Sequence, residues 1–269
     1  MIQASHGKDV WGKEKFSYQV CERCGSFYLV NIKTDKLFLQ KYYSPGKYYR
    51  KEKKLFSYLD KLMQKYSNNE KRKILEYYLP KERNIKILDV GCGDCQFLKS
   101  LGKDKYERCG IDINKNYIDL RADNINITTG DFFDAKFHTK FDVVTMWHVF
   151  EHLKNPDLAL KKIRSLLNRD GICIISTPNP LCLGNRFGGK KWFHTDAPRH
   201  LTLFTESGIR FISQKTDFKV IGVKNIKFEF PLDLFWSVRG SVLSPLIYLF
   251  YPLLKLFDDE TFTYVLKRN

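Results

Sequence analysis

The sequence has no long apolar run that is free of helix-breaking residues. Its longest apolar stretch, SVLSPLIYLFYPLLKLF at residues 241–257, contains Pro245 and Pro252 and has Lys255 near its end. A helix that crosses a bilayer needs about 20 predominantly apolar residues. Proline in a helix interior removes a hydrogen bond and clashes with the preceding turn. A membrane-spanning helix is therefore not expected here.

Three alternatives remain for this apolar stretch. It is a helical cap over a substrate pocket, a surface for homodimer formation, or an element that lies at a membrane interface. In the third case Trp236, Phe250 and Phe257 are expected in the headgroup region, with lysines on anionic lipid.

The sequence also lacks an apolar segment at its start. The residues MIQASHGKDVWG contain no hydrophobic region of a signal peptide. The seven cysteines are an odd number in a long chain, which does not fit the disulfide framework of a small secreted domain. We therefore expect a reduced, cytoplasmic protein, with membrane association as an open addition.

No arginine-rich tract, internal repeat or low-complexity segment is present. Lysine and arginine nevertheless total 46 against 30 acidic residues, which gives a net charge of +16. Such an excess favours an anionic neighbour, whether nucleic acid, an acidic lipid surface or a phosphorylated substrate. Solvated lysines scattered along helices are the alternative, and both interpretations stay open at this point.

The composition that is present supports a folded chain with a sizeable core. Apolar residues make up 43% and aromatic residues 15% of 269 residues, which excludes a wholly disordered protein. We divide the chain into an irregular, tyrosine-rich segment at 1–50, a helical segment at 51–83, and one α/β domain at 84–269. That domain carries two inserts, at 180–204 and 229–258.

Short β-branched runs alternate with amphipathic stretches through most of the α/β domain. Such alternation is typical of βαβ units and of a parallel sheet covered on both faces. We predict a Rossmann-like, seven-stranded, mostly parallel sheet, whose last strand pairs antiparallel beside the sixth. The expected strands are 85–90, 107–113, 125–130, 141–147, 171–177, 218–225 and 261–268.

A glycine-containing loop follows the first of these strands, in ILDVGCGDCQFL. Gly91 and Gly93 permit a tight turn and a close approach of the backbone to a ligand. A third glycine is absent, and Cys95 stands where it is expected. Alone this pattern is weak evidence, but its position between a strand and a helix strengthens it.

Acidic residues stand at the ends of three successive strands. Asp89 ends the first strand, Asp112 ends the second, and Asp131 follows the third in TGDFF. The carboxyl ends of parallel strands meet at one edge, so these acids are expected to face one crevice. Asp112 can accept from ribose hydroxyls. Asp131 can accept from an adenine amino group while Phe132 stacks on the ring.

This set of motifs resembles the class I S-adenosylmethionine-dependent methyltransferases. The matching segments, in family order, are ILDVGCGDCQFL, GIDI, TGDFF, FDVVTMWHVFEHL and LLNRDGICIISTPNP, within residues 85–225. The resemblance implies S-adenosyl-L-methionine as cofactor. Its expected binding residues are Asp89, Gly91 and Gly93 for the methionine half, Asp112 and Ile113 for the ribose, Asp131 and Phe132 for the adenine, and Trp147 at the end of the fourth strand.

The stretch MWHVFEHL, directly after the fourth strand, allows three interpretations. His148, Glu151 and His152 share one face if the stretch forms a helical turn. They brace the turn, or His148 or His152 acts as a general base, or the three bind a metal together with His200. The metal arrangement resembles small-RNA 3′-end 2′-O-methyltransferases. However, His148 stands where that family has a glutamate, so we predict no metal ligands.

The insert at 180–204 is rich in glycine and aromatic residues and is expected to act as a lid over the crevice. Its segment DAPRHLTLFT resembles bacterial methyltransferases of glycan and secondary-metabolite pathways. His200 is therefore a third catalytic candidate, beside His148 and His152. The alternative is that Arg199 and His200 fix the loop on the sheet.

One cysteine pair resembles half of a zinc knuckle. Cys21 and Cys24 form a CxxC motif in VCERCGSF, whereas zinc needs four ligands. Related methyltransferases often begin with two such pairs. We interpret this one as a remnant, and His6 supplies at most one further ligand.

The expected reaction is O-methylation of a hydroxyl on a glycan, a lipid-linked sugar or a small metabolite. A metal-assisted RNA 2′-O-methyltransferase is the first alternative, although nucleic acid ranks below a small-molecule or glycan acceptor. A non-catalytic scaffold that binds a membrane or a partner is the second. No spacing in the sequence distinguishes oxygen from nitrogen or carbon as the methylated atom.

Overall fold

The computed structural model describes residues 16–34, 38, 41–43, 54–79, 84–114, 124–227, 229–230, 232–239 and 244–269. Of residues 54–60, 244, 251 and 252 only the backbone is described.

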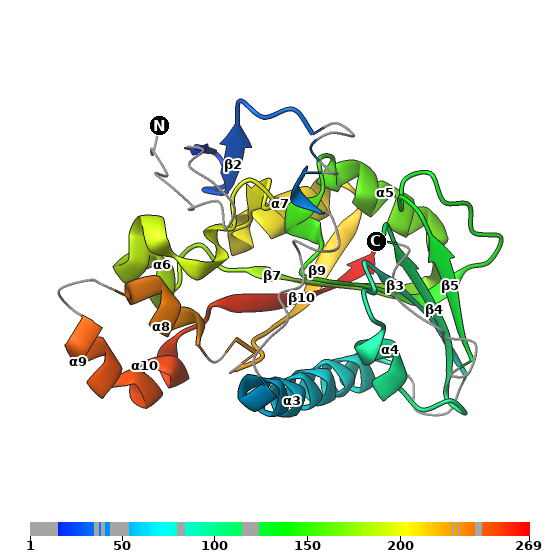
Figure 1. The fold of residues 1–269 in the computed structure, drawn as a ribbon. Coiled ribbons are helices and arrows are strands. Elements are labelled where there is room, and N and C mark those ends of the chain that lie inside the picture. The colour runs from blue at the N-terminus through cyan, green and yellow to red at the C-terminus, as the bar shows by residue number, and fades with distance from the viewer. Residues whose placement is uncertain are drawn as a thin grey trace.

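A seven-stranded sheet with the order β5-β4-β3-β6-β7-β10-β9 forms the centre of the molecule (Figure 1). Its first five strands are parallel, and β10 is antiparallel to both β7 and β9. The predicted mostly parallel sheet with an antiparallel last strand is confirmed, and the structure adds that β10 lies between β7 and β9. The strands are β3 (Ile85–Val90), β4 (Tyr106–Asp112), β5 (Ile125–Thr129), β6 (Phe141–Trp147), β7 (Leu167–Pro178), β9 (Phe218–Lys224) and β10 (Thr261–Arg268).

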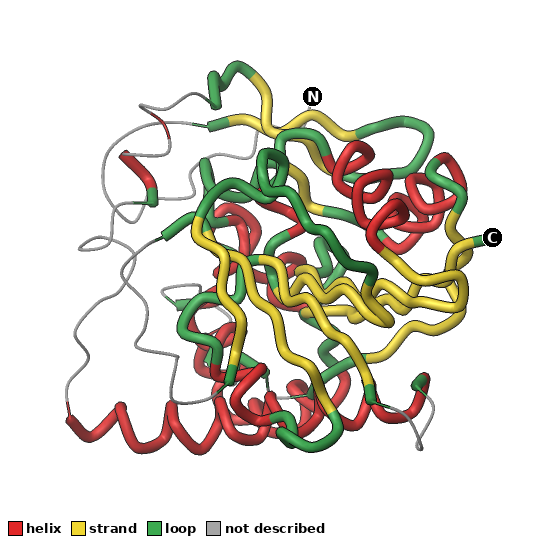
Figure 2. The backbone as a smooth tube through the Cα atoms, turned by 90° about the vertical axis from the view of Figure 1, so that its right-hand side faces the viewer, coloured by secondary structure: helices red, strands yellow, loops and turns green. Residues whose placement is uncertain are grey.

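Helices cover both faces of this sheet, as Figures 1 and 2 show. One face carries α3 (Lys54–Tyr78) and α4 (Gln96–Ser100), and the other carries α5 (Pro156–Leu166) and α7 (Glu206–Lys215). Each face has its own apolar core. Leu75 of α3 packs in a cluster with Ile87 of β3, whereas Leu160 of α5 and Ile209 of α7 pack in a cluster with Leu88. Successive residues of β3 thus supply opposite cores, as the pleat of a strand requires.

The helix α5 shows how the local sequence produces this layering. Pro156 stands in its first turn, where the missing N–H costs no hydrogen bond. Ala159, Leu160, Ile163 and Leu166 recur at helical spacing and are all buried. They form the stripe that packs on the sheet.

A second, three-stranded sheet contains β1 (Ser17–Val20), β2 (Phe27–Val30) and β8 (Thr202–Leu203). The expectation of an irregular segment at 1–50 was wrong for residues 17–30, which form a β-hairpin. Its strands are only four residues long, too short for a clear alternating pattern. The second strand also pairs with β8 from a distant part of the chain, which no local pattern indicates.

Four short helices lie together beyond one end of the large sheet, at the left of Figure 1. The insert at 180–204 supplies α6 (Leu183–Gly188), and the insert at 229–258 supplies α8 (Asp233–Val238), α9 (Ser244–Leu249) and α10 (Tyr251–Phe257). No helix within the described ranges is long and apolar enough to cross a membrane.

A buried group of ionic side chains joins these helices to the sheet. Lys255 of α10 is 3% exposed and contacts Asp233 of α8, and its Nζ lies 3.4 Å from an oxygen of Glu260, next to β10. His194 Nε2 lies 3.4 Å from Glu260 and 3.6 Å from Asp233. Lys255 thus points into the protein, so it is not among the lysines that the membrane-interface alternative would place on lipid.

Candidate active site

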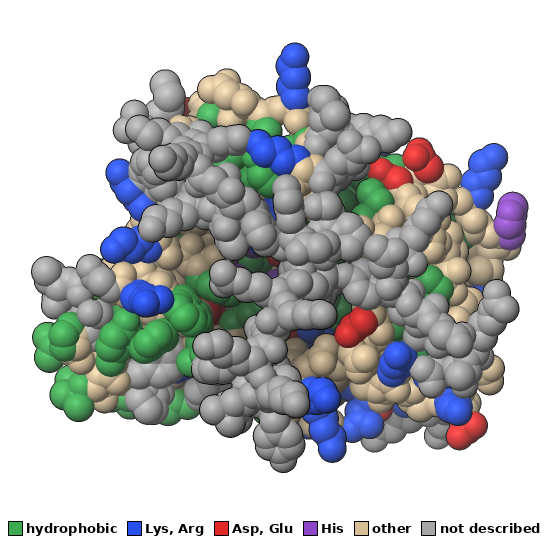
Figure 3. Space-filling model, viewed as in Figure 1, with side chains coloured by type: hydrophobic (Ala, Val, Ile, Leu, Met, Phe, Trp, Pro, Cys, Tyr) green, Lys and Arg blue, Asp and Glu red, His purple; other side chains and the backbone are tan. Residues whose placement is uncertain are grey.

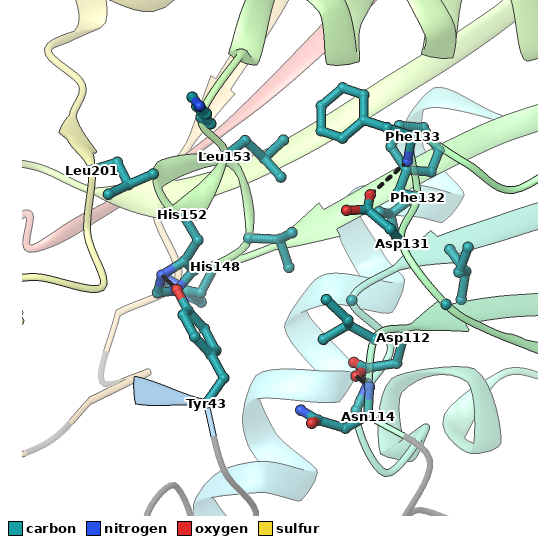
Figure 4. Close-up of a pocket in the computed structure, with 18 of the residues that line it drawn as sticks. Tyr43, Asp112, Asn114, Asp131, Phe132, Phe133, His148, His152, Leu153 and Leu201 are labelled. Atoms are coloured by element: carbon teal, nitrogen blue, oxygen red, sulfur yellow. Dashed lines mark hydrogen bonds between the residues drawn. The ribbon is translucent and has the colours of Figure 1, made fainter. Parts of the chain in front are cut away.

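A cavity of about 560 Å³ opens where four parallel strands end. It is bounded by residues that follow β3, β4, β5 and β6, and by Tyr43 and Leu201 from outside the sheet (Figure 4). This is the edge at which parallel α/β sheets place their ligand sites. The predicted site residues that line it are Gly91, Gly93, Asp112, Ile113, Asp131, Phe132, Trp147, His148 and His152.

The loop after β3 has a backbone that favours glycine. Gly91 and Gly93 have φ angles of +72° and +51°, in a region that glycine occupies without a steric penalty. A Cβ atom at Gly91 would lie 2.4 Å from a methyl group of Val149, so no larger residue fits there. Cys95 also has a φ of +60° and is fully buried. The position expected for a third glycine therefore has a glycine-like backbone despite its cysteine.

Asp112 and Asp131 line the cavity and are held by backbone amides. Asp112 accepts hydrogen bonds from the N–H groups of Gly93 at 2.9 Å and Asn114 at 2.8 Å. Asp131 accepts one from Phe133 N–H at 2.8 Å. These bonds fix the orientation of both carboxylates and leave them lone pairs that can accept hydrogen bonds from a ligand.

The third predicted acid, Asp89, does not line the cavity. It is 3% exposed, and its Oδ1 accepts a hydrogen bond of 2.6 Å from the hydroxyl of Thr145. Burial raises the pKa of Asp89 to about 7, although the Thr145 hydrogen bond opposes this. The cause is the sheet register, because Asp89 of β3 and Thr145 of β6 are paired residues on neighbouring strands. The three acids therefore do not all face one crevice.

His148 lies on the cavity wall between two carboxylates. Its Nε2 is 3.2 Å from Glu229 Oε2, and its Nδ1 is 3.6 Å from Glu151 Oε1. Burial by itself lowers the pKa of His148, but Glu229 and Glu151 outweigh it and raise that pKa above the ordinary value. His148 therefore favours the charged form and balances these two acids.

Glu229 was not identified from the sequence, although it is central to this wall. It accepts a hydrogen bond of 3.0 Å from Ser67 and forms an ion pair of 2.8 Å with Lys71 of α3. Burial alone would raise the pKa of Glu229, but Lys71 and His148 hold it well below its usual range. Ser67, Lys71 and His148 lie more than 80 residues away in the sequence, and Thr261, whose hydroxyl donates to Glu229 at 3.3 Å, lies 32 residues away. No local motif could therefore have indicated Glu229.

Glu151, His152 and His200 form a compact group, with one possible ligand atom from each within 4.8 Å of the others. Glu151 is fully buried, and among the described residues neither of its carboxylate oxygens has a hydrogen-bond partner. Burial raises the pKa of Glu151, but the surrounding histidines lower it to about 2. A buried carboxylate without a hydrogen bond is rare, and in the described part of the chain this one faces the imidazoles of His148, His152 and His200.

The two histidines of this group have their tautomers set by backbone carbonyls. His152 Nδ1 lies 3.0 Å from the carbonyl oxygen of Arg199, and His200 Nδ1 lies 2.7 Å from that of His194. A carbonyl only accepts, so the proton sits on Nδ1 in both rings and Nε2 carries the lone pair. Burial lowers the pKa of each to about 4. His152 lines the cavity, whereas His200 lies behind it.

Tyr43 is a further cavity residue that the sequence did not indicate. Its hydroxyl lies 3.1 Å from His152 Nδ1 (Figure 4).

The cysteines Cys21 and Cys24 lie away from the cavity, in the turn of the β1–β2 hairpin. Among the described residues no third histidine, cysteine, aspartate or glutamate completes a metal group with them, and His6 lies outside the described residues.

Comparisons with known proteins agree with this geometry. A family model described as a methyltransferase domain matches residues 63–223, which is more than half of the chain. The chain is 30% identical over 121 residues to a ubiquinone biosynthesis O-methyltransferase of Actinobacillus pleuropneumoniae, covering 39% of this chain and 52% of that protein. It is 31% identical over 107 residues to that of Glaesserella parasuis, covering 35% and 45%. The chain thus spans about half the length of the curated relatives it matches.

The solved structures that share this fold include methyltransferases. The plantazolicin methyltransferase BpumL, in complex with SAH, superposes with a TM-score of 0.57 at 18% identity, covering 87% of this chain and 94% of that one. The 1,6-didemethyltoxoflavin-N1-methyltransferase of Burkholderia thailandensis gives 0.52 at 11% identity, covering 79% and 81%. Because the family match covers most of the sheet and its ligand-binding edge, the chain belongs to the class I S-adenosylmethionine-dependent methyltransferases.

Proposed function

We propose that this protein transfers a methyl group from S-adenosyl-L-methionine to a hydroxyl on a glycan, a lipid-linked sugar or a small metabolite. One observation carries the proposal. A neutral histidine, His152, stands on the cavity wall across from the two acids Asp112 and Asp131 (Figure 4). The names of the partial relatives, which are O-methyltransferases, support oxygen as the methylated atom.

The half of the cavity beside β3, β4 and β5 fits the cofactor. The loop at Gly91 and Gly93 has no side chain to block a close approach. The oriented carboxylate of Asp112 suits ribose hydroxyls, and Asp131 with Phe132 suits adenine. When bound, S-adenosyl-L-methionine supplies a methyl carbon that is already activated by its sulfonium.

The other half of the cavity suits the acceptor. A hydroxyl must lose its proton as its oxygen gains the methyl group, and a neutral imidazole can take that proton. The Nε2 lone pair of His152 fits this role because Nδ1–H is committed to the Arg199 carbonyl. His148 suits it less, since both of its nitrogens face carboxylates. Because His200 does not line the cavity, we assign it a positioning role.

The cofactor assignment predicts a specific loss of binding in Asp112→Ala. Hydrogen bonds to a charged group contribute about 1.5–3 kcal/mol, so the variant should bind S-adenosylhomocysteine about 10–100-fold more weakly in calorimetry. The matched control is Asp104→Ala, which removes an exposed acid outside the cavity and should bind as the wild type does. If Asp112→Ala and wild type bound S-adenosylhomocysteine with equal affinity, Asp112 would not be a cofactor-binding residue.

A second candidate function, metal-assisted methylation of an RNA 2′-hydroxyl, has one observation in its favour. Glu151, His152 and His200 together offer a carboxylate and two neutral imidazoles. Two histidines and a carboxylate are a common ligand set for divalent transition metals. In this alternative His152 is a ligand and not a base, and the ion would activate the acceptor.

One labelling experiment separates these functions. Purified protein and radiolabelled methyl donor are added to polar, lipid and RNA fractions of cell extract, each with EDTA or with added divalent metal. We expect label in the polar or lipid fraction, with no effect of EDTA. Label in RNA that disappears with EDTA would support the second candidate. Binding of S-adenosylhomocysteine without label in any fraction would instead favour a non-catalytic scaffold.

A further inference from the structure

The helices α8, α9 and α10 present an apolar surface to solvent. The side chains of Leu246, Leu249, Phe250, Leu253, Leu256 and Phe257 are between 51% and 72% exposed. We call these six residues the apolar patch. The helices α9 and α10 lie at the lower left of Figure 1, and in the same view Figure 3 shows a green, apolar area there. Six large apolar side chains on two consecutive short helices form a contiguous exposed area of the kind that marks an interaction site.

The opposite side of the same helices is anchored in the protein. Ile247 of α9 is buried in a cluster with Leu234 and Val238 of α8. Phe235 stacks on Tyr248 with ring centroids 4.5 Å apart, and Lys255 is held by Asp233 and Glu260. This packing fixes which side of α9 and α10 faces the protein. The apolar patch lies on the other side of these helices and therefore faces solvent.

Exposed basic side chains lie at the end of α8 and on the segments that pack against α8. Arg186, Lys190, Lys191 and Arg239 are all exposed, and blue side chains lie directly above the green area in Figure 3. Lys191 Nζ donates to the carbonyl oxygen of Arg239 at 3.3 Å, and the Arg239 guanidinium lies 5.4 Å from the ring of Trp236. We call these four residues the basic rim. The only acid in residues 232–257 is Asp233, which is buried.

We propose that the apolar patch and the basic rim together bind the surface of an anionic membrane. Apolar side chains of α9 and α10 enter the interface between headgroups and acyl chains, while the basic rim meets the anionic headgroups. The helices of six and seven residues are far too short to span the bilayer, so the contact is peripheral.

The charge pattern favours lipid over a second copy of the chain. A twofold dimer formed through this face would place one basic rim near the other, and each chain carries a net charge of +16. Like charges across an interface oppose association, whereas an anionic surface complements them.

The test is co-sedimentation with vesicles of phosphatidylcholine, alone or with about 30 mol% phosphatidylglycerol. Wild-type protein should bind the anionic vesicles at least about tenfold more tightly than the neutral ones, and less tightly as salt is added. The double variant Leu249→Ser/Phe257→Ser and the double variant Lys190→Glu/Lys191→Glu should each weaken that binding at least about tenfold.

Matched controls change similar residues on other surfaces. Tyr77→Ser/Leu158→Ser removes two other exposed apolar side chains, and Lys103→Glu/Lys161→Glu reverses two other exposed lysines. Both should bind vesicles as wild type does, and all four variants should keep the wild-type melting temperature.

The proposal would be overturned if the wild-type protein did not bind the vesicles, or if the control variants lost as much binding as the patch and rim variants. A dimer in analytical ultracentrifugation that only Leu249→Ser/Phe257→Ser dissociates, without vesicle binding, would assign the patch to a second copy. None of these readouts depends on methyl transfer.

Discussion

Replacement of His152 by alanine is expected to lower kcat by about 10²–10⁴-fold, the usual contribution of a general base. The residue lines the cavity, its Nδ1–H is committed to the Arg199 carbonyl, and its low pKa keeps it neutral. It is therefore the histidine best placed to remove the acceptor proton. The measurement is initial-rate methyl transfer to the acceptor found by labelling.

The controls for His152→Ala separate catalysis from binding and folding. S-adenosylhomocysteine affinity should stay at the wild-type value, because the half of the cavity that we assign to the cofactor is formed by other residues. Wild-type affinity also shows that the variant is folded, even if loss of the imidazole beside buried Glu151 lowers the melting temperature. His138→Ala, at an exposed position outside the cavity, should retain full turnover. If His152→Ala is as active as His138→Ala, the proton is removed elsewhere. If it is inactive and wild type also loses activity with EDTA, His152 is a metal ligand.

The second large effect is expected on stability. Lys255→Met should lower the free energy of unfolding by about 3–5 kcal/mol, the range for removing one partner of a buried ion pair. Methionine has a similar length and keeps the apolar contacts, but it leaves Asp233 and Glu260 buried without their ammonium. Urea unfolding monitored by circular dichroism measures the change.

A second lysine–aspartate pair provides the comparison. Lys227 and Asp259 lie 2.6 Å apart, with side-chain exposures of 35% and 43%. Lys227→Met should cost less than about 1 kcal/mol, because solvent screens exposed pairs. The double variant Lys255→Met/Asp233→Asn should recover part of the loss by removing one of the orphaned charges. A cost for Lys255→Met no larger than that for Lys227→Met would show that solvent reaches this cluster.

Local patterns predicted the elements of the sheet closely. The strands expected at 85–90, 141–147 and 261–268 have those bounds in the structure. Each is a run of strand-forming residues with clear limits, and each of the first two enters a loop at the ligand-binding edge. The turn at Gly91 and Gly93 was predicted equally well. A positive φ is a local property of the backbone, and glycine in the sequence indicates it.

Side-chain direction at the site was less predictable. Asp89 is the last residue but one of β3 and Asp112 is the last residue of β4, yet only Asp112 lines the cavity. The difference comes from the neighbour across the sheet, since Thr145 lies beside Asp89 in the register and binds it within the core. The sequence contains both residues but does not state which strands pair or in which register.

The amino-acid sequence by itself determined the α/β class, the glycine loop after β3 and the family, because these depend on strand periodicity, turn-forming glycines and motifs within a few residues. Only the tertiary structure decided that Glu229 and Lys71 stand behind His148, that Glu151 meets His200, and that α9 and α10 turn six apolar side chains outward. Those arrangements join segments tens to more than a hundred residues apart. They arise from the packing of whole elements, which sets burial and charge contacts that no local pattern contains.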